Sequence, residues 1–237
     1  MLENIMVKAK TADEAFIQWY KLLSSQNDCS KSRDGDVVGE AINAITVIED
    51  PTRCIMTNDL RKMSLRYAFG EMLWYASANE NIHNTIDKFT KVWEGLSDDG
   101  VTVNSNYGYC IKKKFGFDQY EYVKQILKND KNSRQAVIHI KDARNTIENP
   151  TKDLNCTVCL QFLIRDEKLY LTAYMRSNDL WLGFPYDVFN FTALQVLLSM
   201  ELEVGLGTYT HIDGSLHLYK RDFDKVNERE GKNVWFA

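Results

Sequence analysis

The sequence predicts one α+β domain, because strand-like alternation and helix-like periodicity occur in separate segments of the chain. The clearest strand signal lies in Asn155–Met175, and the longest helix signal lies in Tyr186–Glu201. No internal repeat, low-complexity block or interdomain linker interrupts the 237 residues. We therefore expect a single domain over residues 1–237.

The segment Asn155–Met175 is predicted to form a β-hairpin. Apolar residues recur at every second position on both sides of the polar turn Asp166-Glu167-Lys168. Cys156 then opens the first strand, and Arg176 follows the second. Side chains at strand ends are held more rigidly than side chains on free loops, so a nucleophile and an anion-binding cation could be fixed here.

The remaining elements follow from spacing and caps. Amphipathic helices are expected over Thr11–Leu23, Ser64–Ala78, Asp118–Lys128 and Tyr186–Glu201, with Thr11 and Asp118 as N-caps. Strands are expected after Arg33 as far as Ile48, over Ala136–Ile140 and over Tyr209–Tyr219. Gly205 and Gly207 are expected to end the helix before the last strand, and Asp222–Ala237 to form a polar tail.

Composition restricts the class of protein. The hydrophobic share of 44%, the charged share of 26% and the absence of a long apolar run or signal peptide predict a soluble protein of the cytoplasm, the host's if the protein is viral. A net charge of −4 argues against direct nucleic-acid binding. Five scattered cysteines do not suggest a disulfide framework. Cys156 and Cys159 have CxxC spacing but lack a second ligand pair, so no metal is expected.

Several motifs occur in a fixed order along the chain. They are Cys156 with Gln161-Phe162, then Arg176-Ser177-Asn178-Asp179, Leu182-Gly183-Phe184-Pro185 and Gly214-Ser215-Leu216-His217-Leu218-Tyr219. Upstream stand Glu71-Met72-Leu73-Trp74-Tyr75, Trp93, Tyr107-Gly108 and Asn132-Ser133-Arg134. Together these motifs resemble the thymidylate synthase family from about Arg33 onward. The resemblance implies a mixed β-sheet packed by helices and a homodimer whose two sheets stack face to face.

Three departures resemble the deoxycytidylate (dCMP) hydroxymethylase branch of that family. Asp187 replaces an Asn, Thr157 replaces the His after the cysteine, and Ser215 replaces an Asp. The branch implies transfer of a one-carbon unit from 5,10-methylenetetrahydrofolate to C5 of dCMP, an activity associated with viral DNA modification. The alternatives are a thymidylate synthase or dCMP C5 methyltransferase, and a non-catalytic dimer that binds nucleotide or folate.

The resemblance also implies residue roles. Cys156, Glu71 and Asp187 would be catalytic, with Asp187 also reading the base. The nucleotide would contact Arg33, Arg134, Arg176, Ser177, Tyr107, Gln161, His217 and Tyr219. The folate would contact Trp93, Asp179, Gly183 and Ala237. Arg-Arg is usual in the family where this chain has Arg134-Gln135, so one phosphate-binding cation is missing.

The chemistry of these residue types fits the roles, and each has a simpler alternative. A cysteine thiolate adds readily to a conjugated ring and leaves readily, and a nearby arginine lowers its pKa. A free cysteine is nevertheless most often a small buried hydrophobe. Glu71 shares a helix face with apolar residues, where a carboxylate is either partnered at the edge or functional. Arg33 alone would be a solvated surface charge.

Overall fold

A computed structural model describes residues 2–26, 30–31, 37–144 and 151–223. The chain divides into two compact units. The first comprises Met1–Met63, Met175–Thr192 and Thr208–Ala237, and the second comprises Ser64–Tyr174 and Ala193–Gly207. Arg33 and Ala237, both predicted site residues, lie outside the described residues.

The first unit contains a mixed β-sheet built on the long strand β4 (Val37–Ile48). Two short strands, β1 (Leu2–Glu3) and β2 (Met6–Ala9), run parallel to β4, while β3 (Ser30–Lys31) runs antiparallel to it. Strand β9 (Gly205–Tyr219) pairs antiparallel with β4, and β8 (Asn178–Asp179) pairs parallel with β9. The expected strand ending at Ile48 is confirmed, and the four short strands β1, β2, β3 and β8 were not predicted.

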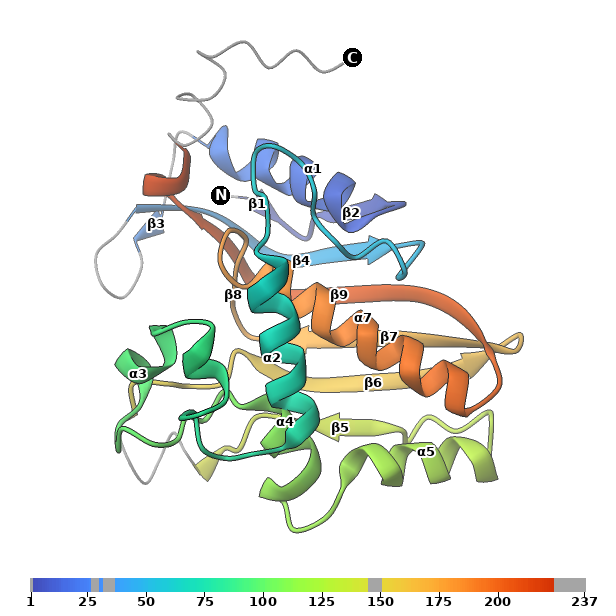
Figure 1. Ribbon diagram of the computed structural model, residues 1–237. Coiled ribbons are helices and arrows are strands. Elements are labelled where there is room, and N and C mark those ends of the chain that lie inside the picture. The colour runs from blue at the N-terminus through green and yellow to red at the C-terminus, as the bar shows by residue number, and fades with distance from the viewer. Residues whose placement is uncertain (1, 27–29, 32–36, 145–150, 224–237) are drawn as a thin grey trace. The chain divides into compact units, whose positions relative to one another are not determined.

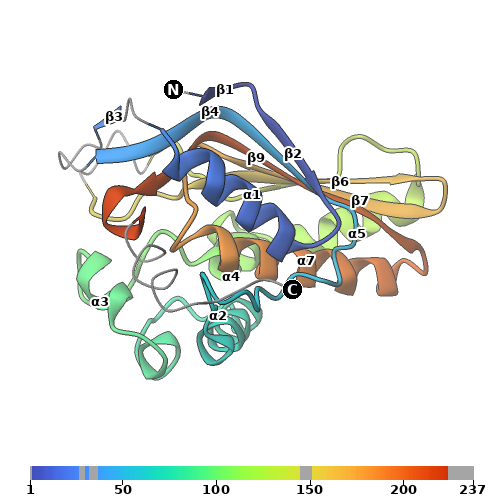
Figure 2. The same cartoon turned by 90° about the horizontal axis from the view of Figure 1, so that it is seen from above.

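Helix α1 (Ala12–Ser24) covers one face of these strands (Figures 1 and 2). Thr11 caps it as predicted, since its side chain accepts a hydrogen bond from the amide of Glu14. Phe16, Trp19 and Leu23 are fully buried on its inner side, and the indole N–H of Trp19 donates to the Thr46 hydroxyl on β4 at 2.7 Å. This packing forms the core of the first unit.

The alternation of buried residues along β9 changes at Gly214. Before it the odd-numbered residues are buried, among them His211 and Asp213, whereas after it Leu216 and Leu218 are buried. On β4, Asn43 lies opposite Gly214 in a register that is the same on both sides, and it has a positive φ of 53°. As a result, His217 remains partly exposed although His211, six residues earlier, is buried.

The second unit is mainly helical around a small sheet. The helices described in it include α2 (Leu65–Ser77), α3 (Val92–Leu96), α4 (Tyr107–Tyr109) and α5 (Gln119–Asn129), with a 3₁₀ turn at Ile86–Lys88 and a π-helical turn at Cys110–Lys114. Ser64 and Asp118 cap α2 and α5 through their side chains. Trp74, Ile82, Ile86 and Val103 form a buried cluster beneath α2. The predicted α2 and α5 are therefore confirmed to within a residue at each end.

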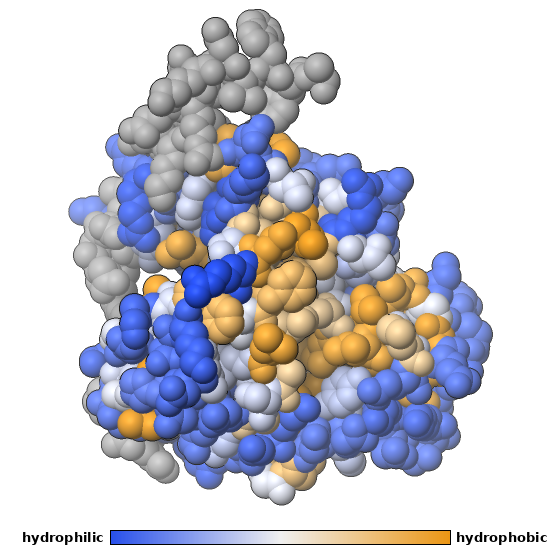
Figure 3. All heavy atoms as spheres, in the orientation of Figure 1, coloured by the Kyte–Doolittle hydropathy of each residue, from blue (hydrophilic) through white to orange (hydrophobic). Residues whose placement is uncertain are grey.

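The exposed side of α2 carries an apolar stripe. Leu65, Phe69 and Leu73 lie one helical turn apart and are 43%, 47% and 60% exposed. Apolar residues are seen gathered on this face in Figure 3. Glu71 belongs to the opposite, inner side, because its side chain is only 5% exposed.

The predicted hairpin is present as strands β6 (Thr157–Arg165) and β7 (Lys168–Met175), with β5 (Val137–His139) antiparallel to β6. Asp166 and Glu167 both have positive φ, which is the geometry of a two-residue type I′ turn. Cys156 immediately precedes β6 and Arg176 immediately follows β7, as expected.

Helix α7 (Phe184–Glu201) begins two residues before the predicted start, because Pro185 fits the first turn of a helix. The prediction that Gly205 and Gly207 end this helix was wrong. Both belong to β9, and a side chain at Gly207 would lie 2.7 Å from the Tyr170 ring. Among the described residues, no helix is long and apolar enough to cross a membrane.

Candidate active site

Cys156 lies half-buried at the entrance to β6 in the second unit. Its sulfur is 4.0 Å from the Leu154 carbonyl oxygen. The next backbone amide, that of Thr157, donates to the Tyr107 hydroxyl at 3.4 Å. Tyr107, a predicted nucleotide contact, is therefore next to the candidate nucleophile.

The position of Tyr107 is fixed from α2. Its ring stacks on Tyr75 with centroids 5.6 Å apart. Gly108 permits this approach, since a Cβ there would lie 2.0 Å from the Tyr75 carbonyl oxygen. Any side chain at Gly108 would push Tyr107 away from the start of β6.

Glu71 and Trp93 are linked through Tyr67. The Tyr67 hydroxyl donates to the Glu71 carboxylate at 2.6 Å, and the Trp93 indole N–H donates to the Tyr67 oxygen at 3.3 Å. Glu71 is thus a hydrogen-bonded buried carboxylate, as its predicted role requires. Tyr67 was not predicted as a site residue, although its four-residue spacing from Glu71 on the helix was visible in the sequence.

Gln161 and Arg134 are also brought together. The Gln161 side chain donates to the Arg134 carbonyl oxygen at 3.4 Å and accepts from the Tyr174 hydroxyl at 3.3 Å. Gln161 therefore holds the backbone of the loop that carries Arg134, while the Arg134 side chain is exposed.

In the first unit, Arg176 and Ser177 connect β7 to β8. A side chain at Gly214 would come within 2.9 Å of the Arg176 carbonyl oxygen, so glycine allows the two backbones to approach. Arg176 is exposed and Ser177 is half-buried. Both are accessible to a ligand, as an anion-binding pair must be.

His217 and Tyr219 share one face of β9, as their spacing predicted. Their ring centroids are 5.2 Å apart, and the Arg221 guanidinium lies 4.1 Å above the Tyr219 ring. Nδ1 of His217 is buried and has no hydrogen-bond partner within the described part of the chain. A ligand hydroxyl is a suitable partner for such a nitrogen.

Asp179 ends β8 and organises the turn toward α7. Its carboxylate accepts hydrogen bonds from the amides of Trp181 and Leu182 at 2.8 and 3.0 Å. Burial raises the pKa of Asp179, and the Leu182 amide and the charge of His217 offset this only in part.

Asp187 lies in the first turn of α7, where the helix dipole favours an ionised carboxylate. Gly183 makes room beside it. A Cβ at Gly183 would lie 2.6 Å from Oδ1 of Asn178 and 3.3 Å from Oδ2 of Asp187. The predicted base-reading and folate-contacting positions, Asp187 and Gly183, are therefore neighbours.

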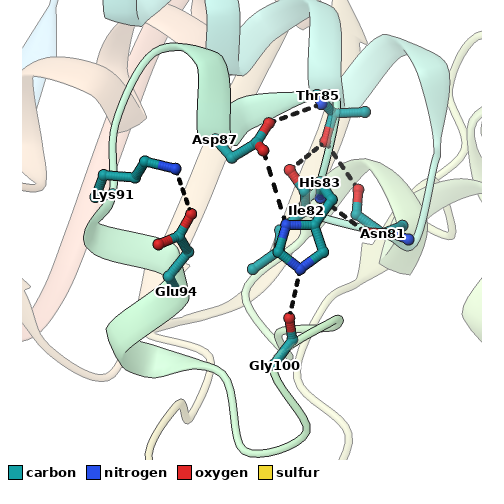
Figure 4. Close-up of polar contacts among 8 residues, drawn as sticks. All are labelled: Asn81, Ile82, His83, Thr85, Asp87, Lys91, Glu94 and Gly100. Carbon is teal, nitrogen blue, oxygen red and sulfur yellow. Dashed lines mark hydrogen bonds and ion pairs between the residues drawn. The ribbon is translucent and has the colours of Figure 1, made fainter.

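A second group of possible ligand atoms lies in the second unit (Figure 4). His83, Asp87 and Glu94 each offer an atom within 4.8 Å of the others. Each of the three side chains already has a partner in the protein. His83 Nε2 lies 2.7 Å from the Gly100 carbonyl oxygen, Asp87 accepts a hydrogen bond from the Thr85 amide, and Glu94 forms an ion pair with Lys91. None of the three belongs to the predicted site.

Two cavities also occur in the second unit. One of about 300 Å³ is lined by residues of 115–119 and 139–143 and contains no predicted site residue. The other, of about 100 Å³, is lined by Leu96 together with polar residues that include Asn104 and Asp153. Leu96 packs against the same cluster as Tyr67 and Trp93. The smaller cavity therefore shares a lining residue with the cluster against which Tyr67 and Trp93 pack.

Comparison with known proteins gives the family. Residues 23–233 match the family model described as thymidylate synthase. A deoxyuridylate hydroxymethyltransferase of Bacillus phage SP01 is 31% identical over 216 residues, which cover 83% of this chain and 56% of the relative. A thymidylate synthase of Bacillus atrophaeus is 30% identical over 181 residues, covering 72% and 78% respectively. The chain thus spans little more than half the length of the phage relative, and it belongs to the thymidylate synthase family.

Proposed function

We propose that the protein is a folate-dependent dCMP hydroxymethylase in which both units form one catalytic domain. The observation that carries the proposal is the Asp187 carboxylate at the start of α7. An ionised carboxylate accepts hydrogen bonds from the 4-amino group and a protonated N3 of cytosine, but it has no proton to donate to O4 of uracil.

Cys156 is the proposed nucleophile. Its thiolate forms a bond to C6 of the pyrimidine, and the electrons of the C5–C6 double bond make C5 nucleophilic. When bound, methylenetetrahydrofolate supplies the carbon that C5 attacks, and it leaves as tetrahydrofolate. Glu71, held by Tyr67, receives the C5 proton through water. Water then adds its oxygen to the exocyclic carbon, and elimination of Cys156 restores the ring.

The other predicted residues bind and orient. Arg33, Arg134, Arg176 and Ser177 are assigned to the phosphate, and His217 with Tyr219 to the sugar hydroxyl. The unpartnered Nδ1 of His217 supports the latter assignment. Tyr107 and Gln161 support the start and middle of β6, where the nucleotide would lie.

The folate is assigned to Trp93, Asp179, Gly183 and Ala237. The donor set fits a pterin ring, because Asp179 is an acceptor and Trp93 offers an aromatic face. The buried Asp179 carboxylate can accept from pterin N–H groups in addition to the two backbone amides that it already binds.

Water rather than hydride is proposed to complete the reaction. Many members of the family have a second tryptophan after Trp93 where this chain has Leu96, and Leu96 lines the cavity of about 100 Å³. That volume can hold water, and its polar lining offers hydrogen-bond partners. The name of the phage relative, a hydroxymethyltransferase, agrees with this outcome.

The same relative favours a second candidate, because its name specifies deoxyuridylate. A deoxyuridylate hydroxymethylase, a thymidylate synthase and a dCMP methyltransferase would share Cys156 and the phosphate site. These three activities differ from the proposed one in the base of the nucleotide substrate or in the group that is added to C5. A non-catalytic nucleotide- or folate-binding dimer would lack turnover with every nucleotide.

Product analysis tests the proposal. We expect dCMP with methylenetetrahydrofolate to give a nucleotide with the mass gain of a hydroxymethyl group and tetrahydrofolate as the second product, with CMP and dUMP assayed in parallel. Hydride transfer would instead oxidise the folate to dihydrofolate. A dihydrofolate absorbance rise stoichiometric with a methylated nucleotide would overturn the hydroxymethylase assignment.

The proposed assembly is a homodimer in which Arg134 completes the phosphate site of the partner. Arg134→Ala and Cys156→Ala proteins, each inactive alone, are expected to regain activity when dissociated and reassociated together, because one site in each mixed dimer is intact. Turnover of dCMP after mixing measures this.

Arg165→Ala is the matched control, because Arg165 is another cation of the same unit and its guanidinium binds the Asn132 carbonyl oxygen. This variant is expected to be active without mixing. Demonstrated mixed dimers of the first two variants without any recovered turnover would contradict the shared site.

A further inference from the structure

The first unit contains a buried ionisable group that the proposed reaction does not use. Tyr209, His211 and Asp213 on β9 are all 0% exposed. Nδ1 of His211 lies 2.6 Å from the Tyr209 hydroxyl, and Nε2 lies 3.1 Å from a carboxylate oxygen of Asp213. The rings of Phe184 and Phe191 pack around His211, so the pair lies in an apolar environment.

The geometry of the pair favours a charge on His211. The Nε2–Oδ1 separation is an ion-pair distance, but neither Asp213 oxygen has a hydrogen bond from the residues that the structure describes. A buried carboxylate of this kind requires a neighbouring cation. Burial lowers the pKa of His211, but the charges of Asp213 and Asp187 outweigh burial and raise it.

Asn178 connects this pair to Asp187. The Asn178 side-chain amide lies 2.9 Å from Nε2 of His211 and is 2% exposed. Its other end, Oδ1, has no hydrogen-bond partner in the described part of the chain and lies over Gly183, beside Oδ2 of Asp187. Burial raises the pKa of Tyr209, and the charges of Asp187 and Asp213 raise it further.

A charged His211 fixes the orientation of the Asn178 amide. An imidazolium has a proton on Nε2, which points to the Asp213 carboxylate at 3.1 Å. The Asn178 atom at 2.9 Å from Nε2 then has to be the amide oxygen, because an amide N–H would face another N–H. The amide nitrogen then faces the side of Gly183 on which Oδ2 of Asp187 also lies. This orientation also removes the unpaired buried oxygen, which costs free energy when it has no donor.

We propose that Asn178, His211 and Asp213 are positioning residues that hold the Asp187 carboxylate in the orientation that selects cytosine over uracil. The inference rests on the proposed role of Asp187. In this arrangement the Asn178 amide donates to the Asp187 carboxylate and thereby sets the plane in which the carboxylate meets the base. Asp213 stabilises the charge on His211 and thereby the orientation of Asn178.

The test compares kcat/KM for dCMP and dUMP in Asn178→Ala and His211→Phe proteins. Loss of one hydrogen bond at Asp187 corresponds to about 1 kcal/mol or more, so the dCMP/dUMP ratio is expected to fall roughly 5-fold or more in both. The phenylalanine keeps the aromatic packing with Phe184. If the His211→Phe protein does not fold, the dCMP/dUMP ratio of the Asn178→Ala protein still tests the inference, because the Asn178→Ala substitution leaves the His211–Asp213 pair intact.

Thr46→Val is the matched control, because it removes a buried hydrogen bond to Trp19 in the same sheet. The Thr46→Val protein is expected to have a lower free energy of unfolding but an unchanged dCMP/dUMP ratio of kcat/KM values, which is the result of a purely structural effect. An unchanged ratio in Asn178→Ala, alongside a changed ratio in Asp187→Asn, would overturn this inference alone. An unchanged ratio in Asp187→Asn would instead overturn the proposed role of Asp187 itself.

Discussion

A Cys156→Ala protein is expected to lose turnover by on the order of 10⁴-fold or more while retaining its fold and nucleotide binding. The reason is chemical. Without a thiolate at the entrance to β6, nothing adds to C6, and C5 of an aromatic pyrimidine stays too weak a nucleophile to react. Steady-state kinetics with dCMP and methylenetetrahydrofolate measure the loss. Incubation with a 5-fluorinated nucleotide and the folate should leave a covalent complex on the wild-type protein and none on the variant.

Cys159→Ala provides the control, since Cys159 lies three residues further along β6 and burial raises its pKa. A half-buried thiol with a raised pKa is a poor nucleophile, so this variant should form the covalent complex normally. Trapping at Cys159, or trapping that persists in Cys156→Ala, would rule out Cys156 as the nucleophile.

An Asp187→Asn protein is expected to shift its preference from dCMP toward dUMP. An amide can donate to O4 and accept from N3–H of uracil, whereas the carboxylate matches cytosine. Leaving one buried polar group unpaired costs roughly 1 to 3 kcal/mol, which is about 5- to 150-fold in the ratio of kcat/KM values. Competition between the two nucleotides, with product masses as the readout, measures this ratio.

Glu201→Gln is a suitable comparison, because it also neutralises a carboxylate of α7, but at the other end, where Glu201 pairs with Lys124. The dCMP/dUMP ratio of kcat/KM values of the Glu201→Gln protein should equal that of the wild-type protein. If Asp187→Asn and Glu201→Gln give the same ratio, Asp187 does not read the base, and the deoxyuridylate candidate gains support.

The strongest local patterns in the sequence were sufficient to predict most long elements. The hairpin of β6 and β7 follows from alternation around a polar turn, and the caps Thr11 and Asp118 follow from side chains that satisfy free helix amides. The short strands β1 and β2 were missed because runs of two and four residues carry too little periodicity. Pairing with β4, a tertiary effect, defines them.

Candidate site residues that belong to a local sequence motif could be predicted from the sequence. Contacts between residues that only the fold brings together could not. Cys156 and Arg176 were placed at strand ends from local pattern alone. The contact of Gln161 with the Arg134 backbone joins residues 27 apart and required the pairing of β5 with β6. His211 stands between Thr210 and Ile212 in the sequence, which does not mark it as buried, and its burial beside Asp213 became apparent only in the sheet.

The change of alternation at Asn43 and Gly214 separates two tasks along β9. The residues before Gly214 bury the ionisable group around His211, whereas the residues after it leave His217 and Tyr219 partly exposed. If the proposed roles hold, substitutions in the buried segment change the base preference while the segment that contacts the sugar stays constant. Relatives that act on different pyrimidines would then differ along the first part of this strand and keep the second part.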